Sequence, residues 1–296
     1  MEAHIKKGVE NHLQENDLIR DSQHGFMSGK SCATNLLHFL VVLTKAVDEG
    51  LSVDVVYLDF AKAFDKVPHS LLMHKLTAYG IGGKVWNWIK NWLSDRRQRV
   101  VVNGEASPWA EIKSGVPQGS LLGPVLFKIY INDIDDVAEL ISLLLKFADD
   151  TKLAQIIRDE EDRRRLQAAL DALMDWASKW GMQFNTGKCK VMHVGRHNPA
   201  YTYEMGGQTL ATTKAEKDIG VIVSSDMKPG DQCAKAARTA STVLIYSRYP
   251  GAWILYGSTG ITQQVQVRTH LRKKLLYSSH FILHNFIPDI SVLTSK

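Results

Sequence analysis

The amino-acid sequence predicts an α+β fold in which helices pack on an antiparallel sheet. Helical periodicity is clearest over residues 160–180, where apolar side chains recur at spacings of three and four. The apolar runs 141–148 and 151–155 have only two residues between them, which indicates a tight hairpin. Further short runs of strand-forming residues, joined by glycine-bearing turns, occur over 182–223. Because hairpins join antiparallel strands, we expect an antiparallel sheet.

The N-terminal part is predicted to form a helix and then a buried strand. Residues 33–48 place leucine and valine side chains on one helical face, and Gly50 is suited to end that helix. The run Val53–Leu58 is rich in β-branched and aromatic residues, which is typical of a strand, and Asp59 follows it directly.

The middle of the chain is predicted to alternate helices with strands and loops. Apolar residues at helical spacing, or a proline suited to a first helical turn, indicate three helices. A loop that begins Asn-Gly joins two short strands, and a glycine-punctuated loop follows them. In chain order, the elements are helices over 68–79 and 85–93, strands over 98–103 and 109–113, a loop over 114–120 and a helix over 124–132.

The C-terminal part is predicted to follow the helix over 160–180, which Gly181 ends, with short strands and one more helix. Gly206 and Gly207 provide a hairpin turn, and the periodic patterning is lost over 245–296. The predicted elements are strands over 182–185, 190–194, 201–205, 208–211 and 219–223 and a helix over 229–244.

Composition places the chain among ordinary globular proteins. Its 296 residues allow about two domains. Hydrophobic residues make up 45% and charged residues 23%, with a mean hydropathy of −0.15, which excludes a disordered chain. Lys and Arg outnumber Asp and Glu by 36 to 31, so the net charge is +5. That charge suits a polyanionic partner without requiring one.

Targeting signals and cysteine patterns add few constraints. No apolar stretch reaches the roughly 18 residues of a membrane span, and the polar N-terminus has no signal core, so we expect an intracellular protein (nucleus, cytoplasm or both) that is not secreted and has no membrane partner. The cysteines at 32, 189 and 233 form no C-x-x-C pair, which argues against a disulfide scaffold. Cys189 and His193 either share a metal or are a buried thiol and a strand histidine. The lack of a second pair favours the latter.

Three aspartates are the strongest candidates for chemistry. Asp59 ends a buried-looking strand, and Asp149 and Asp150 lie at a hairpin tip. Ionised carboxylates beside apolar runs are costly, and each raises the pKa of its neighbour. Divalent cations remove that conflict, and two such ions about 3.5–4 Å apart would suit phosphoryl transfer. The alternative is structural: Asp-Asp is a good turn dipeptide, and Asp59 would only solvate a strand end.

Six segments resemble motifs of reverse transcriptases of the LINE-type (non-LTR) retrotransposon group. Their order along the chain makes the resemblance specific, and it covers about residues 5–244. The catalytic segments are Tyr-Leu-Asp-Phe-Ala-Lys-Ala-Phe-Asp-Lys-Val-Pro-His at 57–69, Ser-Gly-Val-Pro-Gln-Gly-Ser-Leu-Leu-Gly-Pro at 114–124 and Phe-Ala-Asp-Asp-Thr at 147–151; the accompanying segments lie at 23–31, 180–190 and 216–221.

The resemblance implies a site with two Mg²⁺ ions, for which Mn²⁺ is an acceptable substitute. Asp59 and Asp149 would hold both ions with help from Asp150, and the backbone carbonyl of Phe60 would be a further ligand. The implied reaction is attack by a primer 3′-hydroxyl on the α-phosphorus of a deoxynucleoside triphosphate (dNTP), with pyrophosphate as the leaving group.

The resemblance also implies residues that bind the nucleotide. Phe64 would be a steric gate that excludes a 2′-hydroxyl, although the residue also suits a helix core. Gln118 and Gly119 would support the pair of template base and nucleotide, with glycine allowing close backbone approach. Lys188 would be a general acid for the leaving pyrophosphate, with Lys190 as a competing candidate.

The implied architecture is a polymerase right-hand palm with partial fingers and an incomplete or degraded thumb. The parts would be partial fingers over 1–52, a catalytic palm with inserted fingers elements over 53–225, and a partial thumb with an atypical tail over 226–296. The family's endonuclease domain and a fingers arginine that grips the triphosphate have no counterpart. We therefore expect a truncated copy.

The predicted function is RNA-directed DNA polymerisation, with an RNA template, a DNA primer and dNTPs as partners. The alternative is a catalytically inactive retroelement remnant with at most weak nucleic-acid binding. A further alternative is another palm-type nucleotidyl transferase, such as a maturase-related enzyme. The sequence leaves the oligomeric state open.

Three smaller features have a structural and a functional interpretation. Asp65 is expected to cap the helix that begins near Pro68. The arginines over 163–165 follow acidic residues and are expected to form a self-neutralising helix face. The basic residues Lys84, Lys90, Arg96, Arg97 and Arg99 alternate with tryptophans. Tryptophans at helical spacing favour a core, whereas the charges suit a phosphate backbone.

Overall fold

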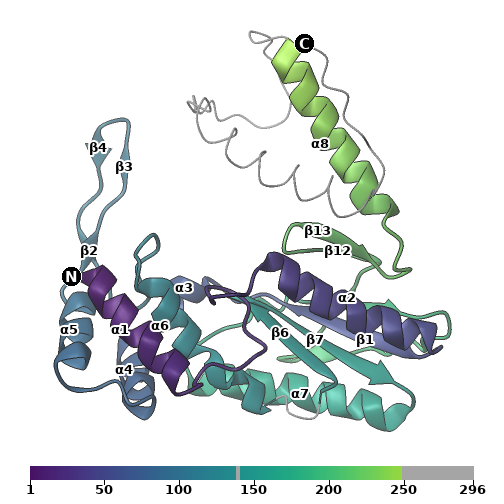
Figure 1. Ribbon diagram of the computed structural model, residues 1–296, viewed down its shortest axis with the longest axis horizontal. Coiled ribbons are helices and arrows are strands. Elements are labelled where there is room, and N and C mark those ends of the chain that lie inside the picture. The colour runs from purple at the N-terminus through teal and green to yellow at the C-terminus, as the bar shows by residue number, and fades with distance from the viewer. Residues whose placement is uncertain (138–140, 249–296) are drawn as a thin grey trace. The chain divides into compact units, whose positions relative to one another are not determined.

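The computed structural model describes residues 1–137 and 141–248 (Figure 1). The chain divides into two compact units, Met1–Ser241 and Thr242–Lys296, and each is considered by itself. Of the second unit, the structure describes only the end of helix α8, Gly230–Arg248. Most of the segment 245–296, predicted to be an atypical tail, therefore lies outside the described residues. No helix among the described residues is long and apolar enough to cross a membrane.

A five-stranded sheet forms the centre of the first unit, in the order β11-β8-β1-β7-β6. Strand β1, Ser52–Leu58, lies in the middle and runs antiparallel to β7, Asp150–Ile157, and to β8, Lys190–Val194. Strand β6, Leu143–Phe147, continues the antiparallel pattern, whereas β11, Ala211–Thr212, is parallel to β8. The predicted α+β class is confirmed, with one parallel strand at an edge.

Strand β1 is apolar because both faces of the sheet are covered. Successive side chains of a strand point to opposite faces, so Val53 and Val55 pack with helix α2, Cys32–Asp48, while Val56 and Leu58 pack into the larger core on the other face. Figure 1 shows α2 over one face of the sheet and α7 on the opposite side.

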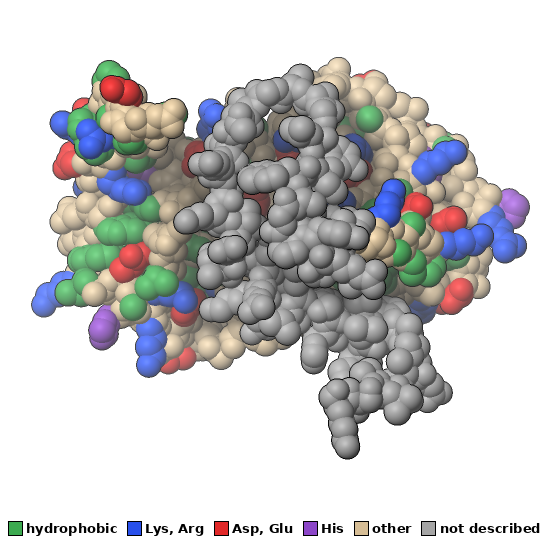
Figure 2. Space-filling view, turned by 90° about the horizontal axis from the view of Figure 1, so that it is seen from above, with side chains coloured by type: hydrophobic (Ala, Val, Ile, Leu, Met, Phe, Trp, Pro, Cys, Tyr) green, Lys and Arg blue, Asp and Glu red, His purple; other side chains and the backbone are tan. Residues whose placement is uncertain are grey.

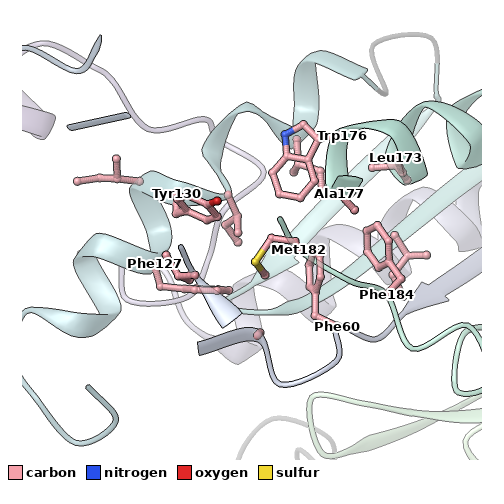
Figure 3. Packing of buried hydrophobic residues seen from close by; sticks show 14 of the residues in the cluster. Phe60, Phe127, Tyr130, Leu173, Trp176, Ala177, Met182 and Phe184 are labelled. Carbon is pink, nitrogen blue, oxygen red and sulfur yellow. The ribbon is translucent and has the colours of Figure 1, made fainter. Parts of the chain in front are cut away.

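Helices and aromatic side chains fill the larger core (Figure 3). Its longest helix is α7, Glu160–Lys179, which confirms the helix predicted over 160–180. The remaining helices of the first unit are α1 at Glu2–Glu15, α3 at Ala63–Lys66, α4 at His69–Ala78, α5 at Gly83–Leu93, α6 at Gly123–Tyr130 and a 3-10 helix at Asn132–Val137.

Some short elements differ from their prediction. The segment 182–185 forms only an isolated bridge, in which Phe184 pairs with Phe60. The strand predicted over 219–223 corresponds to β13, Val221–Ser224, which begins two residues later and pairs with β12, Ala215–Asp218. The Gly206-Gly207 turn is confirmed, and it joins strands of only two residues each, β9 at Glu204–Met205 and β10 at Gln208–Thr209.

A hairpin of two short ladders follows helix α5, and we call residues 96–113 the arm. The Asn-Gly turn is confirmed, because Asn103 and Gly104 both have positive φ angles, 51° and 87°. The loop is shorter than predicted, because strand pairing resumes at Glu105. The ladders are β2 at Arg97–Gln98 with β5 at Ala110–Glu111, and β3 at Val101–Val102 with β4 at Glu105–Ala106.

Candidate active site

The antiparallel sheet brings two acidic segments to one edge. Because β1 and β7 run in opposite directions, the end of β1 lies beside the start of β7. Leu58 is the partner of Thr151 in the register, so Asp59, which follows β1, lies next to Asp150, which begins β7. The acidic residues predicted to converge therefore share this edge of the sheet.

The hairpin turn beside Asp59 differs by one residue from its prediction. Phe147 pairs with Asp150, so the two turn residues are Ala148 and Asp149 rather than both aspartates. Ala148 has φ 58°, in the left-handed region that alanine rarely adopts. That conformation needs support from the surrounding structure.

Support for the turn comes from a segment far away in the sequence. The side-chain oxygen of Gln23 accepts hydrogen bonds from the backbone N–H groups of Gly25 and Ala148, at 2.7 and 3.1 Å. The backbone of residues 22–24 also bonds to both backbone groups of Lys146. Sequence reasoning assigned this segment to the fingers and missed its contact with the turn. The one signal of this contact in the sequence is the Gln-x-Gly pattern at 23–25.

Lys188 lies at the same edge for the same topological reason. Strand β8 runs antiparallel to β1, so residues just before β8 lie beside the end of β1. The Lys188 ammonium is 3.8 Å from a carboxylate oxygen of Asp59, and its side chain is 71% exposed. Lys190, the competing candidate, donates a hydrogen bond to Glu216 at 2.9 Å. Lys188 therefore lies beside Asp59, whereas Lys190 is paired with Glu216.

Two carboxyls of the acidic cluster have raised pKa values. Burial raises the pKa of the Asp149 carboxyl, and repulsion from Asp59 raises it further. The pKa of Asp150 is also raised, first by loss of solvent around it and then by repulsion from Asp149, Asp218 and Asp59. Such a site favours either protonation or a bound cation.

This repulsion predicts that Asp149→Asn stabilises the protein in the absence of divalent cations. A raised carboxylate pKa means that the folded state binds a proton more readily than the unfolded state, so ionisation at neutral pH lowers the free energy of unfolding. The thermal midpoint of Asp149→Asn in EDTA should therefore exceed that of the wild type. The difference should shrink as pH falls through the raised pKa toward about 3.9, where the unfolded carboxyl is also protonated.

The matched control is Asp175→Asn, which changes an exposed aspartate of α7. It should leave the thermal midpoint unchanged. An Asp149→Asn variant that melts below the wild type in EDTA at neutral pH would contradict the electrostatic argument.

The residues at this edge suit a divalent cation that is held partly by the protein and partly by a substrate. Within residues 1–137 and 141–248, no three or more His, Cys, Asp or Glu side chains are arranged as a metal cage. Mg²⁺, however, usually takes one or two carboxylates, several waters and substrate phosphates. Neighbouring carboxylates with raised pKa values supply that donor chemistry. The roles of Asp59, Asp149 and Asp150 as ligands stay a prediction.

The backbone around Asp59 is anchored by the loop after α7. Asp59 accepts a hydrogen bond through its carbonyl from Asn185 at 2.7 Å, and Ala61 donates to Gln183 at 2.8 Å. The Phe60 ring stacks on Phe184, with 4.4 Å between ring centroids. The hydrogen bonds of this bridge are made by Asp59 and Ala61 rather than by Phe60, and the role of the Phe60 carbonyl as a metal ligand stays a prediction.

Cys189 is a buried thiol beneath Asp59. Its sulfur accepts a hydrogen bond from the Asp59 backbone N–H at 3.4 Å, and the residue has no exposed surface. His193 instead contacts Asp54 at 2.7 Å, and Tyr203 also donates a hydrogen bond to Asp54. Of the two interpretations of Cys189 and His193, the structure supports the buried thiol and the strand histidine.

Phe64, five residues after Asp59, packs against the core. Its ring stacks on the fully buried Phe127, with centroids 4.3 Å apart and an angle of 17°. The side chain is only partly buried, so one part remains accessible. The core interpretation is therefore supported, and the role as a gate stays a prediction.

The glycine-bearing loop contacts the short helix α3. Asp65 accepts a hydrogen bond from the Gln118 side chain at 3.2 Å, and its carbonyl accepts one from Ser114 at 2.8 Å. The predicted capping role of Asp65 is wrong, because helix α4 begins at His69 without a side-chain cap. Gly119 has φ 80°, which explains glycine at this position.

A pocket of about 290 Å³ opens beside the acidic edge. The hairpin β12–β13 forms part of its wall, and an ion pair between buried Lys152 and Asp218 ties that hairpin to β7. Its charged lining is balanced: the residues are Asp59, Asp150, Glu216, Asp218, Lys152, Lys188, Lys190 and Lys217.

Comparison with known families and proteins gives one consistent result. Residues 1–233 match the family model described as "Reverse transcriptase (RNA-dependent DNA polymerase)". The chain is 33% identical over 184 residues to the RNA-directed DNA polymerase from mobile element jockey of Drosophila funebris, covering 58% of this chain and 19% of that protein. It is 29% identical over 220 residues to the probable RNA-directed DNA polymerase from transposon BS of Drosophila melanogaster, covering 71% and 23%. The chain thus spans about a fifth of the length of these relatives.

Solved structures support the same fold. Telomerase from Candida tropicalis, in complex with a fragment of telomeric RNA, superimposes with a TM-score of 0.55 at 13% identity. The match covers 77% of this chain and 37% of the telomerase chain. At this identity, the likeness concerns the fold alone.

Proposed function

The chain belongs to the reverse transcriptase family, and from this premise we propose that it is the RNA-directed DNA polymerase domain of a LINE-type retrotransposon. The observation that carries the proposal is the placement of Asp59, Asp149 and Asp150 at one edge of the sheet, where their charges repel one another. The substrates would be an RNA template, a DNA primer and dNTPs.

The parts of the chain then take the names of a right-handed polymerase. The central sheet with α7 would be the palm over 53–225, and residues 1–52 would be partial fingers. The segment from 226 onward would begin a thumb. The contact between Gln23 and the hairpin turn supports the idea that fingers and palm form one cooperative unit.

The chain's own side chains would position the reactants. Asp59, Asp149 and the Phe60 carbonyl would hold Mg²⁺ or Mn²⁺ jointly with the triphosphate, and Asp150 would assist. Bound divalent ions supply charge stabilisation for the attacking and leaving oxygens. The primer 3′-hydroxyl would lose its proton to solvent water, its oxygen would bond to the α-phosphorus, and the bond from that phosphorus to the pyrophosphate oxygen would break. Lys188, next to Asp59, would donate a proton to that leaving group.

Primer extension tests the proposal directly. We expect the purified chain to extend oligo-dT on poly-rA with dTTP, and to stop when the template is omitted or EDTA is added. The same protein should also be assayed for retention of the labelled template–primer on a filter. Template binding without extension under any divalent cation would instead favour the inactive remnant, and extension without template would indicate a terminal transferase.

Phe64→Ala should weaken discrimination against ribonucleotides. An aromatic ring beneath the sugar leaves no room for a 2′-hydroxyl, and removal of such a steric contact is worth roughly 10–200-fold in selectivity. The measurement is the ratio of kcat/KM for dTTP and UTP. Because Phe64 stacks on Phe127, the control is Phe127→Leu, which perturbs the same packing without touching the sugar. Equal loss of selectivity in both variants would show that the effect is only structural.

Lys188→Ala and Lys190→Ala should differ in their effect on the chemical step. A general acid contributes at least about 100-fold, so Lys188→Ala should lower the single-turnover rate by roughly that factor. Lys190→Ala loses only a partly exposed ion pair with Glu216 and should change the rate little. The reverse order of effects would assign the acid to Lys190.

A further inference from the structure

The arm, residues 96–113, exposes apolar side chains that the catalytic edge does not use. Val100, Val101, Val102 and Trp109 are 66%, 56%, 61% and 58% exposed. Figure 1 shows the arm rising beyond the end of helix α5. Runs of exposed apolar residues on a soluble protein usually mark an interaction surface.

The arm is also basic, and its arginines lack acidic partners. Four cationic residues face two acidic ones over 96–113, which gives 4 − 2 = +2. Arg97 is in register with Glu111 on β5, yet neither Arg97 nor Arg99 takes part in an ion pair within the residues that the structure describes. By contrast, the arginines over 163–165 all pair with acidic residues of α7, as predicted.

Cation and aromatic groups are paired along this surface. The Arg99 guanidinium lies 4.6 Å from the Trp109 ring centroid, and that of Arg96 lies 5.9 Å from the Trp92 ring. Figure 2 shows hydrophobic and basic side chains side by side at the end of the molecule that carries the arm. Exposed aromatic rings and guanidinium planes are the surfaces on which unpaired bases stack.

Hydrogen bonds join the two strands of the arm. Val100 and Ser107 exchange two hydrogen bonds between the ladders, at 2.9 and 3.0 Å, and Ile112 donates one to the Arg96 carbonyl at 2.9 Å. The exposed side chains are therefore held on a fixed ribbon, which lowers the conformational entropy lost on binding.

We propose that the arm binds single-stranded RNA, with Trp109 stacking on a base and Arg97 and Arg99 contacting phosphates. The inference rests on the proposed function in one respect: the strand would be the unpaired part of the template. Charge decides between this partner and a protein, because arginines without acidic partners beside an exposed tryptophan suit a polyanion with flat bases better than an apolar surface. The site is separate from the acidic edge.

Fluorescence anisotropy with a short labelled oligo-rA strand tests the arm. Arg97→Gln with Arg99→Gln should weaken binding at least tenfold and reduce the slope of log affinity against log salt by about 1.4, which corresponds to two phosphate contacts on a single strand. Trp109→Ala should weaken binding by roughly 5-fold or more, and Trp109→Phe should restore most of it. Arg97, Arg99 and Trp109 are all exposed, and unchanged thermal midpoints would verify folding.

The matched control is Arg164→Gln with Arg165→Gln, which removes the same charge from α7. Equal weakening in both double variants, or none in the arm variant, would overturn the proposal. If a DNA duplex bound with the same dependence on the arm residues, the single-stranded assignment would be overturned. If light scattering showed a dimer that the arm variants convert to a monomer, the arm would be assigned to self-association. Each binding assay is repeated with Asp149→Asn added, which measures RNA binding without catalysis. The test of the arm therefore stays valid even if the chain has no polymerase activity.

Discussion

Asp149→Ala is expected to abolish primer extension while the protein stays folded. Asp149 is the turn residue whose carboxyl lies beside Asp59, and the substitution removes one of the two carboxylates proposed to hold metal and triphosphate. Loss of groups that only support a metal ligand costs about 10–100-fold, so loss of a ligand itself should cost at least roughly 100-fold in kcat. Steady-state extension of oligo-dT on poly-rA at saturating Mg²⁺ provides the measurement.

The control for this prediction is Asp175→Ala, on the exposed face of helix α7. It changes the net charge equally and should retain wild-type activity. Asp149→Ala should also melt no lower than the wild type in EDTA, since the replaced carboxylate is repelled by Asp59. Activity within tenfold of the wild type would remove Asp149 from the metal site, and equal extension by both proteins would indicate a contaminating polymerase.

The convergence of the acidic residues was predictable because two sequence features determine it. A buried strand ends at Asp59, and a tight hairpin carries the second pair, so an antiparallel pairing of these strands leaves the acids at one edge. The exact turn was not predictable, because Asp149-Asp150 is a better turn dipeptide than Ala148-Asp149. The hydrogen bond from the Ala148 backbone to Gln23 outweighs that local preference.

The supporting contacts escaped prediction because they join residues distant in sequence. The Ala148 backbone N–H donates to the side-chain oxygen of Gln23, which lies 125 positions away in the sequence. The Asp59 backbone N–H donates to the sulfur of Cys189, which lies 130 positions away. Helix α1 was missed for another reason: only Val9 and Leu13 are buried, so its apolar stripe is weak among polar residues. At 182–185 the error is the opposite one: the sequence predicts a strand, whereas the structure has only an isolated bridge at Phe184.

Gly25→Ala is expected to destabilise the segment around Gln23, which supports the turn at Ala148 and Asp149. A Cβ atom at position 25 would lie far inside van der Waals distance of the backbone nitrogen of Ala148 and 3.0 Å from its Cα. Overpacking usually costs about 1–3 kcal/mol, and because backbone rather than a flexible side chain must move, we expect about 3 kcal/mol in the free energy of unfolding. The shift also breaks the hydrogen bonds of Gln23, so extension should fall even under conditions where the variant is folded.

Gly8→Ala is the matched control, because nothing lies within 4 Å of a Cβ at that position of helix α1. Alanine is the better helix former, so this variant should gain about 0.5–1 kcal/mol and keep its activity. Urea unfolding and primer extension on both variants distinguish the cases. If Gly25→Ala were as stable and as active as Gly8→Ala, the segment around Gln23 would not support the turn. If it were stable but inactive, the segment would act mainly by positioning Asp149, which follows the left-handed Ala148 in the turn.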